Sequence, residues 1–145
     1  MKTYIAAFLL LLAIPAAAIA QADAVNGIWL NEEKDAKVQI YRNGDKFFGK
    51  LIWIKHSLED DGKTPRRDAK NTTTSLRSRP LLNLIILTGF EYDAGDKVWD
   101  DGKIYDPKSG KTYSSKLKLK GNMLDIRGYV GAPMFGRTTY WTRSE

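Results

Sequence analysis

Hydrophobic and polar residues alternate along most of the chain with a period of two. In residues 115–120 lysine alternates with leucine, and Val38 and Ile40 lie on one face of an earlier segment in the same way. Such alternation is typical of strands with one buried and one exposed face. Asn43-Gly44 and Gly121-Asn122 are two-residue turn signals between such segments. The pattern predicts eight strands, at residues 27–30, 36–42, 46–55, 81–92, 98–105, 111–120, 122–130 and 134–143.

The predicted architecture is all-β. Eight short antiparallel strands form a sandwich or a barrel, and barrel closure is favoured because it leaves no exposed sheet edge. After residue 20 no segment shows a helical stripe of apolar residues. We therefore predict one domain over residues 21–145, a small eight-stranded antiparallel barrel. The interior of such a barrel is either filled by side chains or holds one small ligand.

The first twenty residues have the pattern of a cleaved signal peptide. Lys2 is followed by an apolar run at residues 5–14 and by Pro15, and Ala18-Ile19-Ala20 is a small-x-small cleavage signal, with Ala20-x-Ala22 as a second choice. A retained membrane helix is the alternative. We expect a signal peptide at 1–20 and a periplasmic or secreted protein with no membrane span after it. The chain has no cysteine, so it has neither a lipid-anchor site nor a disulfide.

Residues 102–113, GKIYDPKSGKTY, are the most conspicuous polar stretch. Asp106 can accept from the backbone two residues ahead, Pro107 presets its own φ, and Gly110 can take a left-handed conformation. Each residue type suits a bulged hairpin turn. We predict a turn between two strands here rather than a catalytic or binding loop.

The chain offers little material for catalysis. It has a single histidine, His56, and no cysteine, so we predict no catalytic residues, no metal site and no cofactor. The net charge of +6 suits anionic partners, although export makes nucleic acid a poor one. The long polar segment 56–80 is rich in basic residues, namely Lys63, Arg66, Arg67, Lys70, Arg77 and Arg79.

Several short motifs, taken in order, resemble the bacterial domain of unknown function 2147 family over residues 27–143. The family commonly has a glycine after Leu82; here Asn83 stands there, the residue that best replaces glycine in a left-handed conformation. The motifs that carry the resemblance are Gly27-Ile28-Trp29, Tyr41-Arg42-Asn43-Gly44, Phe48-Gly49-Lys50, Asp68 with Asn71, Arg79-Pro80-Leu81-Leu82, Gly89-Phe90, Gly102 to Pro107, Gly110-Lys111-Thr112-Tyr113, Arg127-Gly128-Tyr129-Val130-Gly131, Phe135-Gly136-Arg137 and Trp141-Thr142-Arg143.

The resemblance implies an exported, lipocalin-like (calycin-type) barrel. It also implies that Arg143 packs over the indole of Trp29 as a structural closure at one end of the barrel. Our first hypothesis is a non-enzymatic barrel of the cell envelope that binds a small apolar or anionic ligand in its interior. The residues that we expect at the ligand are Arg127, Arg137, Tyr105, Tyr129 and Trp141.

Two alternatives stay open. If Leu124 and Ile126 face inward, simple alternation sends Arg127 to the outer face, beside Asp125. The second hypothesis is an interaction module with a filled core, in which the basic loop 56–80 docks on an envelope polymer or an unknown protein partner.

Overall fold

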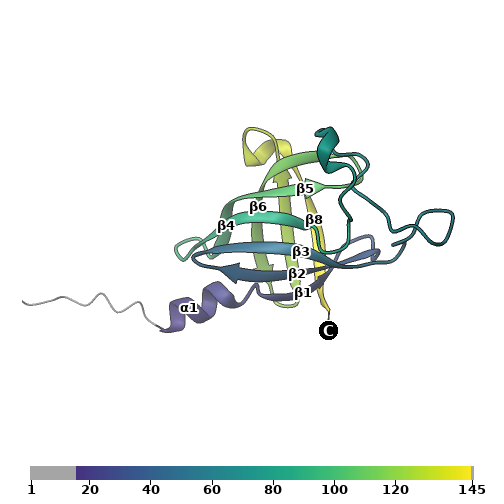
Figure 1. The fold of residues 1–145 in the computed structure, drawn as a ribbon. Helices are drawn as coiled ribbons and strands as arrows, with labels where there is room; N and C mark the ends of the chain where they lie inside the picture. Colours follow the sequence, from purple (N-terminus) through teal and green to yellow (C-terminus); the bar gives the residue numbers. More distant parts are fainter. Residues whose placement is uncertain (1–15, 145) are drawn as a thin grey trace, which may run out of the picture.

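The computed structural model describes residues 16–144 (Figure 1). A short helix, α1 (Ala16–Asp23), precedes the strands, and two 3₁₀ turns, η1 (Thr74–Leu76) and η2 (Pro133–Phe135), interrupt the connections. No helix among these residues is long and apolar enough to cross a bilayer. The strands are β1 (Gly27–Leu30), β2 (Ala36–Asn43), β3 (Lys46–Ile54), β4 (Ile85–Asp93), β5 (Val98–Asp106), β6 (Lys111–Lys120), β7 (Met123–Tyr129) and β8 (Gly136–Ser144).

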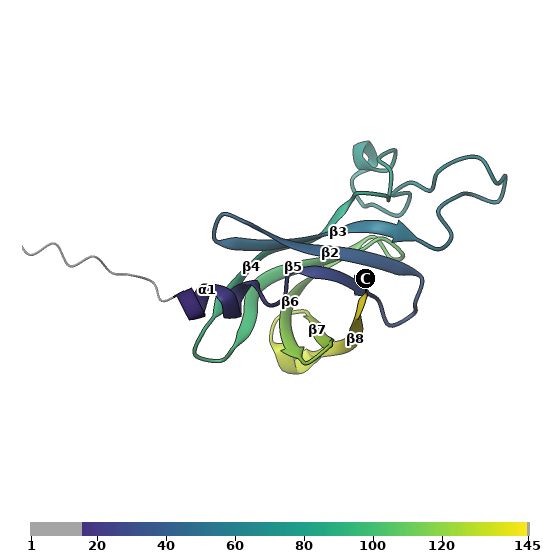
Figure 2. The ribbon, with the colours of Figure 1, turned by 90° about the horizontal axis from the view of Figure 1, so that it is seen from below.

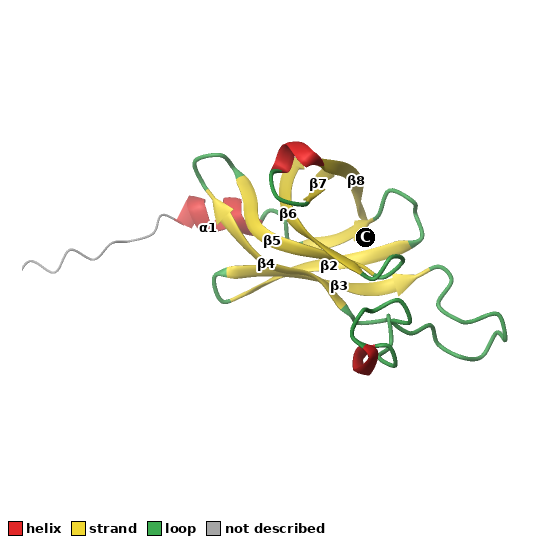
Figure 3. Cartoon of the chain, turned by 90° about the horizontal axis from the view of Figure 1, so that it is seen from above, coloured by secondary structure: helices red, strands yellow, loops and turns green. Residues whose placement is uncertain are grey.

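The eight strands form a closed antiparallel barrel in sequence order. Each strand pairs with the next, and β8 pairs back to β1 through Trp29 opposite Arg143. Closure confirms the predicted fold class and leaves no strand edge unpaired. Helix α1 lies at one end of the barrel and the long β3–β4 connection at the other (Figure 2). Apart from α1 and the two 3₁₀ turns, strands and loops make up the described chain (Figure 3).

Most strand bounds agree with the alternation pattern, but two strands start later than predicted. Strand β4 begins at Ile85 rather than at residue 81, because residues 81–84 close a turn in which Leu84 N–H donates to the Leu81 carbonyl at 3.1 Å. Within that turn Asn83 has φ +68°, the left-handed conformation that asparagine tolerates. Strand β8 begins at Gly136 because residues 133–135 form η2.

The N-terminal end of the barrel is sealed by the segment that links α1 to β1. The sequence predicts no helix here; residues 1–15 of the expected signal peptide lie outside the described residues, and its last five belong to α1. The Trp29 indole N–H donates to the Val25 carbonyl at 2.9 Å, and the Trp99 indole N–H donates to the Ala22 carbonyl at 3.0 Å. Because both tryptophans are buried, these bonds satisfy donors that have no access to water.

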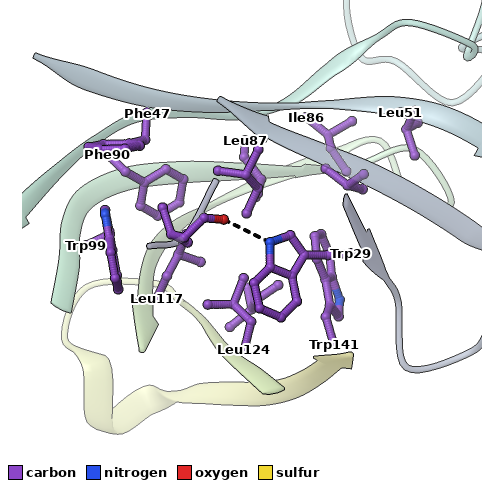
Figure 4. Packing of buried hydrophobic residues seen from close by; sticks show 14 of the residues in the cluster. Trp29, Phe47, Leu51, Ile86, Leu87, Phe90, Trp99, Leu117, Leu124 and Trp141 are labelled. Carbon is purple, nitrogen blue, oxygen red and sulfur yellow. Dashed lines mark hydrogen bonds between the residues drawn. The ribbon is translucent and has the colours of Figure 1, made fainter. Parts of the chain in front are cut away.

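The half of the barrel next to this seal is filled by large side chains. Trp29, Phe47 and Phe90 are at most 1 % exposed, and they point toward one another together with leucines from β4, β6 and β7 (Figure 4). The Trp99 ring lies 6.4 Å from Phe47 in an edge-on arrangement. Aromatic rings of this size leave no room for a ligand in this half, which we call the closed half.

At the opposite end, the 106–110 segment forms the predicted turn and also holds the long loop. The Gly110 N–H donates to the Asp106 carbonyl at 2.8 Å, and Gly110 has φ +74°. A Cβ at Gly110 would lie 1.9 Å from the carbonyl oxygen of Lys70. Only glycine therefore lets the long loop approach this turn so closely.

Candidate ligand cavity

A cavity of about 1010 Å³ occupies the other half of the barrel and opens at the end that carries the long loop. Its wall consists mainly of apolar side chains that alternate inward along the strands. The filled core that the second hypothesis requires is therefore present only in the closed half. The apolar wall residues include Val38, Leu51, Ile54, Ile86, Ile104, Ile126 and Trp141.

Carboxylates at the cavity mouth all have partners within residues 16–144. Lys108 Nζ donates to Asp35 at 2.8 Å and also to Glu33. Burial opposes the charge of Asp35, but the hydrogen bonds from Lys108 and Asn31 outweigh it and hold its pKa below the ordinary value. The remaining carboxylates of the lining are held by a cation or by N–H and hydroxyl donors: Glu59 by Arg66, Glu32 by the Tyr140 N–H, and Asp106 by the Lys108 N–H and the Ser109 hydroxyl.

Three cations at the same mouth have no such partner. Among residues 16–144, the side chains of Arg67, Lys70 and Arg137 make no hydrogen bond or ion pair, and all three line the cavity and are exposed. The carboxylates of the mouth thus have hydrogen-bond or ion-pair partners within the described residues, whereas the side chains of these three cations have none. The lining carries five carboxylates and five cations, and its three unpartnered cations lie above an apolar interior.

The long loop reaches the mouth because a buried carboxylate fixes it. Asp68 is fully buried and accepts from Asn71 Nδ2 at 2.9 Å, from Arg79 Nε at 2.8 Å and from the Tyr105 hydroxyl. Asn71 and Arg79 belong to the loop, whereas Tyr105 belongs to β5. The network therefore ties the loop to the barrel, and Arg67 and Lys70 lie on either side of the tied residue.

Both acids of this network have shifted pKa values. Burial alone would raise the pKa of Asp68, but the three hydrogen bonds and the Arg79 charge more than offset it, so the pKa lies below its usual value. Burial and the neighbouring Asp68 carboxylate raise the pKa of Tyr105. At neutral pH the pair is thus an ionised carboxylate that accepts from a neutral phenol, a charge-assisted hydrogen bond.

Four of the five residues expected at a ligand line the cavity. Trp141 is buried in the wall, Arg137 is exposed at the mouth, and Tyr105 and Tyr129 are half-buried. The Tyr105 hydroxyl is occupied by Asp68, so its ring rather than its hydroxyl is available to a ligand.

Arg127 lies outside the cavity lining. Leu124 and Ile126 face inward, so Arg127 faces outward, as the alternation argument allows. Its Nε donates to the Pro133 carbonyl at 2.9 Å, and its Nη1 donates to the Thr138 hydroxyl at 3.1 Å. Arg127 thus holds the β7–β8 connection in place. Asp125, on the same face, pairs with Lys120 at 2.6 Å instead.

The structure brings Trp29 and Arg143 together in the closed half. The Arg143 guanidinium carbon lies 4.3 Å from the centroid of the Trp29 ring. Its two terminal nitrogens also donate to the Asn26 carbonyl at 3.0 Å and the Ala24 carbonyl at 2.8 Å. The arginine therefore ties the N-terminal seal to the last strand, and it lies outside the cavity lining.

The sequence pattern missed the roles of Arg67, Lys70 and Asp68 at the cavity. It marked the first two only as part of a basic loop and Asp68 only as a family motif residue. The one usable signal was the motif of Asp68 with Asn71, but nothing local shows that Asp68 has Tyr105, 37 positions away, as a partner.

The model of the DUF2147 family, described as an uncharacterized protein conserved in bacteria, matches residues 27–143. No curated protein matches the chain. Among solved structures, the chain is similar to protein HP1028 from the human pathogen Helicobacter pylori, which is described as belonging to the lipocalin family. The TM-score is 0.70 at 24 % sequence identity, over 83 % of this chain and 82 % of that one. This likeness supports a lipocalin-like barrel fold, and the family match over most of the sequence shows that the chain belongs to the DUF2147 family.

Proposed function

We propose that this barrel binds a small amphiphile, with its apolar part in the cavity and an anionic group at the mouth. The observation that carries this proposal is the apolar hollow beneath three unpartnered cations, Arg67, Lys70 and Arg137. Transfer of an apolar chain from water into such a wall is favourable, at about 25 cal/mol per Å². An anionic head group would give these three cations a charge-assisted hydrogen-bond partner.

The size of the cavity supports a single small ligand. Its volume of about 1010 Å³ is at the upper end of the range of about 300–1,000 Å³ that is common for small-molecule pockets. Eight-stranded barrels of the lipocalin type hold one small ligand in this way. We therefore favour a binding protein over an enzyme, and the carboxylates of the mouth are already engaged in ion pairs and turns.

The test uses two fluorescent probes that differ only in charge, 11-(dansylamino)undecanoic acid and its methyl ester. Both should bind, and the acid should bind more tightly. Arg137→Gln should weaken the acid about tenfold, since it removes one charge-assisted contact, and should leave the ester unchanged. Lys118→Gln is the matched control, because Lys118 is an exposed cation on β6 outside the cavity lining.

A second variant blocks the cavity. Thr139 lines the cavity and is half-buried on β8, so Thr139→Phe places a ring in the hollow without removing a core side chain. Binding of both probes should fall, while the circular-dichroism spectrum stays that of the wild type. The proposal fails if neither probe binds the wild type. It also fails if both probes bind the Thr139→Phe variant as tightly as they bind the wild type.

We also infer that the chain is exported and cleaved after Ala20. Cleavage there keeps Ala22, whose carbonyl accepts from Trp99, and Asp23, whose carboxylate pairs with Arg42 at 2.7 Å. Cleavage after Ala22 would leave the buried Trp99 donor without its acceptor, a cost of about 1–3 kcal/mol. The intact mass of the protein recovered from the periplasm or the medium of an expressing bacterium checks this. A mass that still includes residues 1–20, or one that begins at Asp23, contradicts it.

A further inference from the structure

The connection between β7 and β8 carries the most exposed apolar side chains of residues 16–144. Val130 is 70 % exposed, Met134 77 % and Phe135 73 %, whereas every other large apolar side chain in that range is below 50 %. Ala132 and Pro133 lie between them, so residues 130–135 form a continuous apolar tip. Exposed apolar clusters mark sites that contact a membrane, another protein or a ligand.

The apolar tip has a defined conformation. Phe135 N–H donates to the Ala132 carbonyl at 3.0 Å and closes the 3₁₀ turn η2. Arg127 Nε donates to the Pro133 carbonyl at 2.9 Å, and its Nη2 donates to the Met134 carbonyl at 3.5 Å. The Arg127 guanidinium thus donates hydrogen bonds to two backbone carbonyls of the tip, while the side chains of Met134 and Phe135 are exposed to solvent. The tip projects from the barrel at η2 (Figure 3).

The apolar tip borders the cavity mouth. Val130 and Phe135 are part of the cavity lining, and Arg137 follows the tip after Gly136. The other two unpartnered cations, Arg67 and Lys70, line the same cavity. An exposed apolar tip on the rim of a mouth that carries unpartnered cations fits an anionic membrane surface, in which acyl chains lie beneath negatively charged head groups.

We propose that the apolar tip inserts into the surface of an anionic phospholipid bilayer and seats the cavity mouth against it. The proposal goes beyond ligand binding and does not rest on it. A bilayer fits better than a second copy of the chain, because three projecting side chains are far fewer than the roughly 20–30 residues on each side of a stable interface. A few apolar side chains and nearby cations are enough for reversible attachment to a charged membrane.

The test exploits the absence of cysteine from the chain. The Phe135→Cys variant, labelled with the environment-sensitive fluorophore NBD, reports insertion, and the Met123→Cys variant with the same label is the control. Met123 is an exposed apolar residue at the far end of β7, outside the cavity lining. The protein is purified in the form that the expressing cell leaves after processing. It is mixed with vesicles of phosphatidylglycerol and phosphatidylethanolamine, or of phosphatidylcholine alone.

We expect a blue shift of the label at 135, but not at 123, on the anionic vesicles, and a loss of that shift at high salt. In vesicle flotation, the double variant Met134→Ser with Phe135→Ser should bind about tenfold more weakly. The control double variant Met123→Ser with Tyr140→Ser removes two exposed apolar side chains outside the tip, 42 % and 45 % exposed, and should bind as the wild type does. The proposal is overturned by equal shifts at both labels or by the absence of vesicle binding. A shift at 135 that grows with protein concentration without vesicles also overturns it, because it would assign the tip to a second copy.

Discussion

Replacing Asp68 by asparagine removes the charge at the centre of the loop-anchoring network while keeping the shape of the side chain. The carboxylate accepts from Tyr105, Asn71 and Arg79 and is fully buried. An amide at this position has only one acceptor oxygen, and its NH₂ group would face one of those donors. One donor of the network is then left unsatisfied, and the remaining bonds lose their charge assistance.

We expect Asp68→Asn to lower the free energy of unfolding by about 3 kcal/mol. A hydrogen bond to a charged group contributes about 1.5–3 kcal/mol, and the loss of one partner from a buried ion pair costs about 3–5 kcal/mol. We take the lower end of the range for a buried ion pair, because the Arg79 side chain is 36 % exposed and water screens its interaction with Asp68. Asp60→Asn is the control, because Asp60 is fully exposed in the same loop and should change the stability little.

Urea denaturation measured at several pH values gives a second, independent readout. The pKa of Asp68 is lower in the folded chain than its ordinary value of 3.8. Its stabilisation is therefore complete above that value and is lost as the pH falls through the lower folded pKa. The difference between wild type and Asp68→Asn should be full at neutral pH and should shrink in acid, where the wild-type carboxyl becomes neutral as well. A difference below about 0.5 kcal/mol at neutral pH, or one that does not change with pH, would refute the assigned role.

Two further substitutions test the ends of the barrel. Arg143→Ala should lower the free energy of unfolding by about 2 kcal/mol, because it removes the contact with Trp29 and two hydrogen bonds to carbonyls. An unchanged midpoint in thermal or urea unfolding would show that this closure does not stabilise the fold. Gly110→Ala should lower the free energy of unfolding by about 3 kcal/mol or more, because its Cβ would meet the Lys70 carbonyl. Gly44 has a similar positive φ but open space around it, so Gly44→Ala should lower it by only about 1 kcal/mol. Equal losses in the two variants would contradict the close approach of the loop.

The barrel follows from the sequence because its strands carry short-range signals. Alternation and turn residues act over two to four positions, so β6 and the Asn43-Gly44 hairpin are readable without any tertiary information. Strand β4 shows the limit of that information. Its apolar run begins at residue 81, but Asn83 takes a left-handed conformation and delays the strand to Ile85. Asn83 in place of the expected glycine marks an unusual backbone position in the sequence. It does not show that β4 starts later because of it.

The candidate site was only partly predictable, because its chemistry depends on contacts between distant segments. Alternation places Trp141 and Arg137 on the inner face of β8 and Arg127 on the outer face of β7. Which cations remain without partners depends on how the long loop folds back over the mouth. Arg66 forms an ion pair with Glu59 there, whereas the Arg67 side chain has no ion-pair or hydrogen-bond partner among residues 16–144, although the two arginines are neighbours in the sequence.

The size of the inward side chains explains why one half of the barrel is filled and the other is hollow. In the closed half, the inward positions of β1, β3, β4 and β5 carry the aromatic rings of Trp29, Phe47, Phe90 and Trp99. Toward the mouth, the same strands and their neighbours present mainly branched aliphatic side chains, with Trp141 as an aromatic exception, and Gly128, the next-to-last residue of β7, also lines the cavity. Strands of one barrel keep a nearly constant separation, so smaller side chains leave space that the backbone cannot close. The hollow is therefore a consequence of residue choice along each strand, and it lies where the sequence also places the free cations and the apolar tip.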